Sequence, residues 1–540
     1  RLPGTYFEVT KHLEIVTSAS KGEHEFYVEE PEPGTLMSAA IDAMLDELDP
    51  YTVYYPESRI EDLRFMNTGE YGGIGALVQP IDGKTTIMEV YEGYPAQKAG
   101  ILPGDVVLSV GGQSLEGGAS NDDVGELLKG ESGSEVELRI ERPHGGGILD
   151  LMVERAKVRV PAVTYSGMLN DSTGYIYLAK FTRGSAGEVR KALMSLRDSA
   201  GMKQLVFDLR GNGGGLLKES VSIVNLFVPK GTEIVSTRGK SENWNKSYKA
   251  LGRPTAEDMP LVVLIDGQSA SASEIVSGTL QDLDRAVIVG MESFGKGLVQ
   301  QTKDMAFNTR LKVTVAKYYT ASGRCIQRLD YGGKRDAQGK ARAVSDTLLR
   351  TFETKGGRPV IEGRGIQPDI ALETPFMSTL LQRLLDEYQV FYYATQVAAG
   401  LDSTDVPDPV SFALSDADWD QFLEHLKEAE FEYDTESMVV LEELGNVVEL
   451  EQYQGVAEEP LAALRSALEP NLERDLGLFE QEIRQTLEDE VVLRFHYAAG
   501  MVERSLTKDP TVGRALEVFG EEMTSVLGEG VPSESAPTRE

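Results

Sequence analysis

Ser271 and Lys296 are the residues of this chain whose types and spacing best fit covalent catalysis. Ser271 lies in the segment Ser269-Ala270-Ser271-Ala272-Ser273-Glu274, Lys296 follows 25 positions later, and Gln300 comes four positions after the lysine. No histidine occurs between residues 156 and 423, so a serine nucleophile here has no local histidine base. A lysine can act as the general base when burial lowers its pKa towards neutrality. Gln300 could then orient the amine by a hydrogen bond.

A buried strand and a tight turn are predicted directly before Ser271. Residues 261–265 are all apolar, which indicates a buried strand, and residues 271–283 predict a helix that begins at the serine. Backbone N–H groups at the start of a helix stabilise a developing negative charge. Ser271 and Glu274 also match a capping box, and capping serines far outnumber nucleophiles. On this segment alone the capping interpretation is favoured, although one serine can fill both roles in turn.

A second turn, rich in glycine, follows another predicted buried strand at residues 205–209. Its sequence is Arg210-Gly211-Asn212-Gly213-Gly214-Gly215. Consecutive glycines allow positive φ angles and expose backbone N–H groups to an anion. The phosphate-loop pattern fails because Lys218 is followed by glutamate, and the dinucleotide pattern fails because Leu216 stands where a third glycine is required. An oxyanion-binding turn and a purely structural turn both remain open.

Further segments extend these two turns into an ordered set. They are Gly174-Tyr175-Ile176-Tyr177-Leu178 with Phe181, Phe294-Gly295-Lys296-Gly297 with Gln300, Lys317–Gln327, and Gly365-Ile366 with Pro368-Asp369. The set resembles the carboxy-terminal (tail-specific) processing proteases, the S41 class of serine peptidases, over roughly residues 5–375. Ala321 and Cys325 depart from that pattern, in which proline and serine are usual.

The resemblance implies a serine endopeptidase with a Ser-Lys dyad. It assigns six residues: Ser271 as nucleophile, Lys296 as general base, Gln300 as its orienter, and the N–H groups of Ala272 and of Gly214 or Gly215 as the oxyanion hole. Which glycine donates stays open. The substrates would be proteins or peptides with free C-terminal tails, and no cofactor or metal is expected. The resemblance also implies a bacterial protein of the periplasm or cell envelope.

Residues 71–157 predict a small β-rich module with glycine turns. Pro95–Asp105 resembles part of a PDZ domain, and Tyr71–Leu77 resembles its carboxylate-binding loop. By this resemblance Gly73, Ile74, Gly75 and Ala76 would bind the tail of a substrate, whose strand pairs with a free sheet edge. A glycine-rich turn in an ordinary β module is the alternative. Whether the module activates or blocks the site stays open.

We therefore expect a multidomain α/β protein of four parts. They are an N-terminal helical region (1–70), a PDZ domain (71–157), an α/β, crotonase/ClpP-like peptidase core (158–375) and an acidic all-α extension (376–540). Amphipathic periodicity predicts a helix at 36–48 in the first part. In the extension it predicts helices at 380–393, 416–430, 435–450, 461–469, 476–496 and 510–527. Residues 400–411 predict a linker and 531–540 a disordered end.

The negative charge is concentrated in the last third of the chain. Residues 371–540 contain 37 acidic and 10 basic side chains, out of 87 and 53 in the whole chain. This composition disfavours nucleic-acid binding, which needs clustered basic residues. A solvated helical surface is the preferred explanation and a salt-rich habitat the alternative. The extension lies outside the resemblance, and we expect it to mediate self-association or to dock a partner.

Several other functions and locations are disfavoured by the sequence. No run of 18 apolar residues predicts a transmembrane helix, the single Cys325 excludes an internal disulfide, and no His/Cys cluster has zinc spacing. The chain begins at Arg1 without a signal-type apolar segment, so we expect a trimmed sequence. Two alternatives to a protease are a non-catalytic ligand- or partner-binding protein that retains the fold, and a scaffold that tethers a partner through the PDZ domain.

Overall fold

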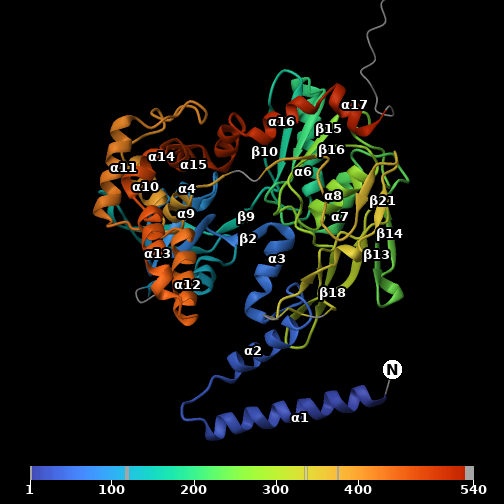
Figure 1. The fold of residues 1–540 in the computed structure, drawn as a ribbon, viewed down its shortest axis with the longest axis horizontal. Coiled ribbons are helices and arrows are strands. Elements are labelled where there is room, and N and C mark those ends of the chain that lie inside the picture. The colour runs from blue at the N-terminus through green and yellow to red at the C-terminus, as the bar shows by residue number, and fades with distance from the viewer. Residues whose placement is uncertain (1–2, 116–120, 334, 337–338, 374–375, 529–540) are drawn as a thin grey trace, which may run out of the picture.

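The computed structural model describes residues 3–115, 121–333, 335–336, 339–373 and 376–528. It has the four kinds of structure expected from the sequence: N-terminal helices, a β-rich module, an α/β core and C-terminal helices (Figure 1). The expected multidomain α/β fold class is therefore confirmed.

A six-stranded sheet forms the centre of the core. Its order is β10-β11-β12-β15-β16-β23, and every neighbouring pair is parallel except the antiparallel pair β10–β11. The strands are β10 (Val163–Met168), β11 (Thr173–Leu178), β12 (Gln204–Asp208), β15 (Leu261–Ile265), β16 (Val287–Gly290) and β23 (Ile370–Ala371). Central parallel strands are covered on both faces, which is why β15 is a continuous apolar run with every residue buried.

Helices cover both faces of this sheet. One face packs against α6 (Ser185–Ala200), α7 (Leu217–Val224) and α8 (Ala272–Asp282). The other face packs against α16 (Pro510–Val518) and α17 (Glu521–Leu527), which come from the end of the chain. The last two helices therefore complete the core of a domain that begins more than 300 residues earlier.

A second sheet lies beside the first and includes a strand from the N-terminal region. Its order is β1-β18-β13-β14, with β17 also paired to β18. The strands are β1 (Val53–Tyr55), β13 (Glu233–Gly239), β14 (Lys246–Lys249), β17 (Leu298–Asp304) and β18 (Arg310–Tyr319). Two small hairpins complete this region: β19 (Leu329–Asp330) with β20 (Arg342–Ala343), and β21 (Thr351–Glu353) with β22 (Pro359–Ile361).

The β-rich module is attached to the core by a two-stranded ribbon. The ribbon pairs β2 (Glu70–Gly73) with β9 (Ala156–Arg159) in antiparallel fashion, so the module begins and ends at one place. The module contains β3 (Ala76–Ile81), β4 (Lys84–Val90), α4 (Pro95–Lys98), β5 (Val106–Val110), β6 (Gln113–Ser114), α5 (Asn121–Leu128), β7 (Glu135–Arg142) and β8 (Gly147–Glu154). Its sheet order is β3-β4-β5-β7-β8, which leaves β3 as an edge strand.

The N-terminal helices are α1 (Pro3–Phe26), α2 (Pro33–Asp46) and α3 (Ile60–Thr68). The helix predicted at 36–48 is α2. In Figure 1, α1 lies apart from the body of the molecule. It carries large exposed apolar side chains, among them Phe7, Leu13 and Ile15.

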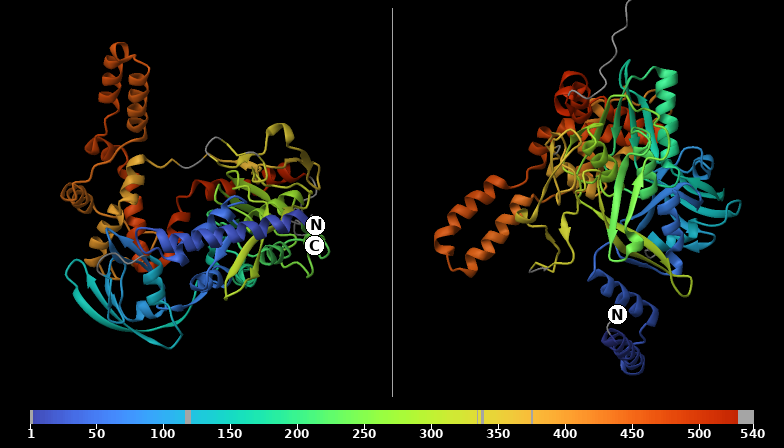
Figure 2. Two further views of the ribbon diagram at one scale, coloured as in Figure 1. Left: turned by 90° about the horizontal axis from the view of Figure 1, so that it is seen from below. Right: turned by 90° about the vertical axis from the view of Figure 1, so that its right-hand side faces the viewer.

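The helices of the extension are more numerous than predicted. They are α9 (Thr379–Asp386), α10 (Gln389–Ala399), α11 (Asp416–Glu428), α12 (Glu436–Leu450), α13 (Gln454–Leu468), α14 (Leu472–Leu478) and α15 (Glu480–Leu506). Figure 2 shows α12 and α13 as a hairpin that projects from the rest of the molecule. None of the described helices has an apolar stretch long enough to cross a membrane.

Three predicted helices were wrong because a turn divides each of them. The segment 380–393 is interrupted at Tyr388, which has φ of 57°, and 510–527 is interrupted at Gly520, which has φ of 110°. The segment 476–496 is divided at Phe479; its predicted end coincides with a kink at Tyr497, which has φ of 56°, and helical structure then resumes to residue 506. Helices on both sides of the first and third turns contribute to one apolar core, so periodicity continues through the turn and does not reveal it.

Two other predictions for the extension, a helix and a linker, were only partly correct. The helix predicted at 461–469 begins earlier, at residue 454, with Pro460 inside it. Residues 400–411 contain no helix or strand, but they are not a free linker, because Arg504 donates hydrogen bonds to the carbonyls of Pro409 (2.9 Å) and Val410 (3.4 Å). The predicted disordered end, 531–540, lies outside the described residues.

Candidate active site

Ser271 lies at the first turn of α8, directly after the turn that follows β15. It has φ of 55° and ψ of −107°, a conformation that non-glycine residues rarely adopt and that usually occurs where the surroundings enforce it. The preceding turn is fixed by Asp266, whose Oδ1 accepts the N–H groups of Gln268 (3.0 Å) and Ser269 (2.9 Å). All of α8 is buried, whereas Ser271 remains partly exposed.

The glycine-rich turn after β12 lies against Ser271. Because β12 and β15 are parallel neighbours, their carboxyl ends bring the two turns to one edge of the sheet. A Cβ atom built on Gly214 would lie 2.6 Å from the Ala270 carbonyl oxygen and 2.9 Å from both Ala272 N and Ser271 Cβ. Gly214, with φ of 97°, must therefore be glycine both for its conformation and for its distance from the serine.

The three candidate oxyanion donors differ in their present partners. Gly214 N–H donates to Asn212 Oδ1 at 2.9 Å. Within the described part of the chain, neither Ala272 N–H nor Gly215 N–H donates to a protein acceptor. Asn212 also holds the two turns together, because its carbonyl oxygen accepts Ala270 N–H (3.0 Å) and Ser273 Oγ–H (2.8 Å).

Lys296 lies in the loop that leads into β17, and its amine is partly buried. The pKa of Lys296 is lowered from 10.5 to about 8; burial is the largest cause, and the positive charge of Lys312 is the second. The carboxylates of Glu274 and Asp49 oppose this shift. A lysine with such a pKa is neutral in a useful fraction of molecules near neutral pH and can accept a proton.

Glu274 joins the serine loop to the lysine loop. Its Oε2 accepts the backbone N–H groups of Ser271 (2.7 Å) and Lys296 (2.9 Å), and its Oε1 accepts Gly295 N–H (2.7 Å) and Ser293 Oγ–H (2.6 Å). This side chain is completely buried, and burial raises its pKa although the four donors oppose that effect. The predicted capping interaction of Glu274 with Ser271 is present, and the same carboxylate also binds the backbone N–H group of Lys296.

Among the described residues, no direct hydrogen bond joins Ser271 Oγ to Lys296 Nζ, but Glu274 binds the backbone of both residues. Catalytic hydrogen bonds are often long without substrate and shorten when it binds. The predicted contact between Gln300 and the lysine is likewise not formed. Gln300 Nε2 instead donates to Thr314 Oγ1 at 3.2 Å, across the β17–β18 pair.

Sequence reasoning missed Asp49 and Tyr51, which come from the N-terminal region. The centroid of the Tyr51 ring lies 4.0 Å from Lys296 Nζ, a cation–π contact. Nothing in the local sequence around Asp49 indicates a partner more than 240 residues away.

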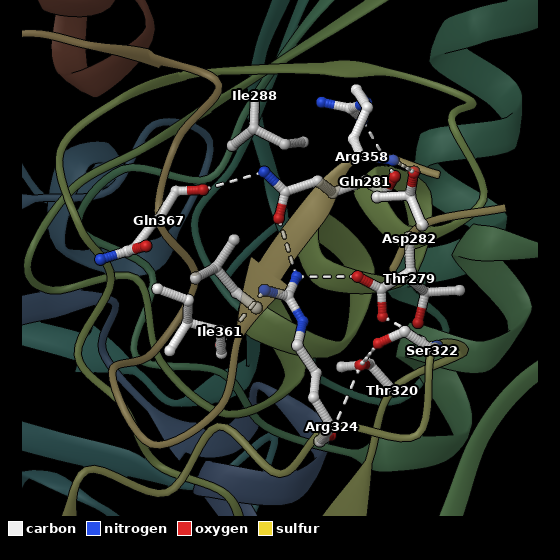
Figure 3. Close-up of polar contacts among 12 residues, drawn as sticks. Thr279, Gln281, Asp282, Ile288, Thr320, Ser322, Arg324, Arg358, Ile361 and Gln367 are labelled. Carbon is white, nitrogen blue, oxygen red and sulfur yellow. Dashed lines mark hydrogen bonds and ion pairs between the residues drawn. The ribbon is translucent and has the colours of Figure 1, made fainter. Parts of the chain in front are cut away.

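The loop of residues 320–328 supports the lysine from the other side. Gln327 Oε1 accepts Gly297 N–H at 2.8 Å. Figure 3 shows how this loop is anchored: the buried Arg324 guanidinium binds Gln281 Oε1 and Asp282 Oδ1, both at 2.8 Å, at the end of α8. The helix that begins at the serine therefore also fixes, through its other end, the loop beside the lysine.

The four predicted tail-binding residues lie where the ribbon enters the β-rich module. Gly73, Ile74 and Gly75 are buried and Ala76 begins the edge strand β3, beside α5. The carbonyls of Ile74 and Gly75 accept N–H groups of Ala96 (2.8 Å) and Tyr91 (2.9 Å), which fixes the loop. An edge strand beside a helix is the arrangement in which an extended peptide can add to a sheet.

Comparisons with known proteins agree with this architecture. Family models match residues 172–337 (Peptidase family S41), 86–142 (PDZ domain) and 380–519 ("Probable PDZ-protease, C-terminal helical domain"). The third match covers most of the extension, which lies outside the resemblance seen in the sequence.

Two bacterial proteins and one solved structure illustrate the relationship. A carboxy-terminal-processing protease of Bartonella bacilliformis is 37% identical over 304 residues, covering 56% of this chain and 69% of the relative. A "probable CtpA-like serine protease" of Staphylococcus aureus is 32% identical over 357 residues, covering 66% of this chain and 63% of the relative. The solved photosystem II D1 C-terminal processing protease is 28% identical over 66% of this chain and 92% of its own, with a TM-score of 0.36.

The fold and these relationships define a serine peptidase with a PDZ domain. The chain belongs to the carboxy-terminal-processing proteases of peptidase family S41, as the sequence resemblance indicated.

Proposed function

We propose that the protein cleaves polypeptides with a Ser271–Lys296 dyad that Gln300 assists. The observation that carries this proposal is the buried Glu274 carboxylate, which binds the backbone N–H groups of both Ser271 and Lys296. One side chain thus holds the serine loop and the lysine loop together, and the lowered pKa of Lys296 suits a general base.

The proposed reaction proceeds through an acyl-enzyme. Ser271 Oγ attacks the scissile carbonyl carbon while its proton passes to Lys296 Nζ, and the resulting oxyanion accepts N–H groups of Ala272 and of Gly214 or Gly215. Gly215 is the better candidate of the two glycines, because Asn212 already occupies the Gly214 N–H. The lysine then protonates the leaving amine. In the second half it deprotonates water, which hydrolyses the serine ester.

The PDZ domain is proposed to select substrates by their free C-terminal tails. The tail would add to the edge of β3 beside α5, with its carboxylate at the N–H groups of residues 73–76. A tail peptide and its C-terminal amide can be compared for binding by the intact protein. At least about tenfold weaker binding of the amide is expected, and equal affinity would contradict carboxylate capture.

The dyad is tested by cleavage of an unfolded protein with an apolar free C-terminus. The intact chain should cleave it, while Ser271→Ala and Lys296→Ala should be inactive with unchanged thermal unfolding. Activity retained in folded Lys296→Ala would remove the lysine from the role of base. An inert intact chain would favour a site that opens only with a partner, or a binding function.

We further propose an envelope location, by family resemblance, and self-association of the protein. Exposed apolar side chains on α1 and on the α12–α13 hairpin, such as Phe7, Leu13, Val440 and Leu450, are the observation that supports association.

A further inference from the structure

The segment 49–55, here called the N-terminal strap, is bound against the second sheet next to Lys296. Its last three residues form β1, which pairs with β18 in the register Val53↔Lys312 to Tyr55↔Arg310. Asp49 is 6% exposed and shapes the turn before β1: its Oδ1 accepts the N–H groups of Tyr51 and Thr52, both at 2.9 Å. The strap lies more than 100 residues before the part of the chain that matches the peptidase family model.

Thr314 connects the strap to Gln300. Its Oγ1–H donates to Asp49 Oδ1 at 3.1 Å, and Gln300 Nε2 donates to the same Oγ1 at 3.2 Å. Gln300 and Thr314 are direct partners across the β17–β18 pair, next to an irregularity between Val299 and Gln300. Such irregularities redirect side chains within a sheet and are common beside active sites.

The chemistry of these three groups fixes the orientation of the glutamine amide. Asp49 Oδ1 already accepts two N–H groups, so it acts as an acceptor and Thr314 must give it the hydroxyl hydrogen. Thr314 Oγ1 can then only accept from Gln300, which places the amide nitrogen towards Thr314. The amide oxygen is consequently directed away from Thr314 and is left to accept a hydrogen bond. These two hydrogen bonds, from Gln300 to Thr314 and from Thr314 to Asp49, are here called the relay. Without the relay, the oxygen and nitrogen ends of the Gln300 amide would be nearly interchangeable.

We propose that Asp49 and Thr314 are positioning residues that present the Gln300 amide oxygen to the Lys296 amine. The inference rests on the dyad proposed above and adds the strap to the catalytic site. Tyr51 belongs to the same strap and places its ring on the amine. The surroundings of the general base, Lys296, thus include a segment that directly follows α2. Displacement of this strap would release Gln300 from its orientation and, at the same time, uncover the Lys296 amine.

A double-mutant cycle between Thr314 and Gln300 tests the relay. Thr314→Val keeps the shape of the side chain and removes the hydroxyl, and we expect kcat to fall about tenfold with little change in KM, in line with the loss of one aligning hydrogen bond. Thr314→Ser keeps the hydroxyl and should restore activity. The double variant Thr314→Val/Gln300→Ala should be no slower than Gln300→Ala alone, because both changes remove the same aligned amide. Thr302→Val, an exposed threonine on β17, is the matched control.

Two outcomes would overturn the relay. One is a double variant whose loss equals the product of the single losses, and the other is a folded Thr314→Ser that is as slow as the valine variant. If Thr314→Val does not fold, Thr314→Ala replaces it in the cycle with the same expectation. Failure of the relay is distinct from failure of the dyad: the first leaves Ser271→Ala and Lys296→Ala inactive, whereas the second is shown by an active Lys296→Ala.

Discussion

Replacing Lys312 with methionine is expected to move the pH dependence of catalysis to higher pH. Lys296 must lose its proton before it can accept one from the serine, so kcat/KM should rise with pH and level off above the pKa of about 8. The Lys312 charge is the second largest cause that lowers this pKa. Without it the Lys296 ammonium is less disfavoured, and the pKa should rise by roughly half a unit to one unit.

The size of the effect follows from the fraction of neutral lysine. With a pKa of about 8, about 9% of Lys296 is neutral at pH 7, and a rise of half a unit to one unit reduces this to about 1–3%. Cleavage at pH 7 should therefore slow by about 3- to 10-fold, while the rate on the alkaline plateau stays nearly unchanged.

The assay is kcat/KM of the intact chain and the variant on one unfolded substrate, from about pH 6 to about pH 10. Lys317→Met, an exposed lysine on the same strand, is the matched control and should leave the midpoint in place. A midpoint that stays fixed or moves to lower pH in Lys312→Met, with the protein folded, would refute the assignment of the titrating group to Lys296.

Three further predictions test the oxyanion turn, the core and the extension. Gly214→Ala should lower kcat at least about 100-fold, because its Cβ would lie 2.6 Å from the Ala270 carbonyl oxygen, next to Ser271. Gly213→Ala, whose Cβ would meet no atom within 4 Å, should remain active in the same cleavage assay. Arg324→Met should lower the free energy of unfolding, measured by denaturant titration, by about 3–5 kcal/mol, since it leaves the buried Asp282 carboxylate unpaired. The matched control is Arg350→Met, at an exposed arginine, which should change this free energy by less than about 1 kcal/mol. Deleting residues 436–468, the projecting hairpin, should reduce the mass in solution measured by light scattering without unfolding the core, and an unchanged mass would exclude the hairpin as the association surface.

The deletion must be confined to the hairpin for a structural reason. Removing residues 400–540, from the predicted linker to the end of the chain, would also remove α16 and α17. Those helices bury Val512, Val518 and Met523 against the central sheet. Loss of association in that larger deletion would not be distinguishable from loss of the core.

Much of the core and of the candidate site could be predicted from the sequence because the signals are local. A continuous apolar run specifies the buried strand at 261–265, and glycines specify the turn at 213–215. Helix-start chemistry placed Ser271 at the first turn of α8, and its pairing with Glu274 was visible in the three-residue spacing. The family motifs carried the rest of the assignment, including Lys296.

The sequence by itself therefore determined the strands, the turns and the residue types that the chemistry needs. Tertiary structure alone decided that Glu274 also binds the lysine loop, that Thr314 bonds to both Gln300 and Asp49, and that the Tyr51 ring lies on the Lys296 amine. It also decided that the chain's last two helices cover the central sheet. The physical reason is range: periodicity, glycine and capping act within one or two turns of the backbone, whereas these contacts join segments separated by up to about 350 residues and form only when the packed sheets bring them together.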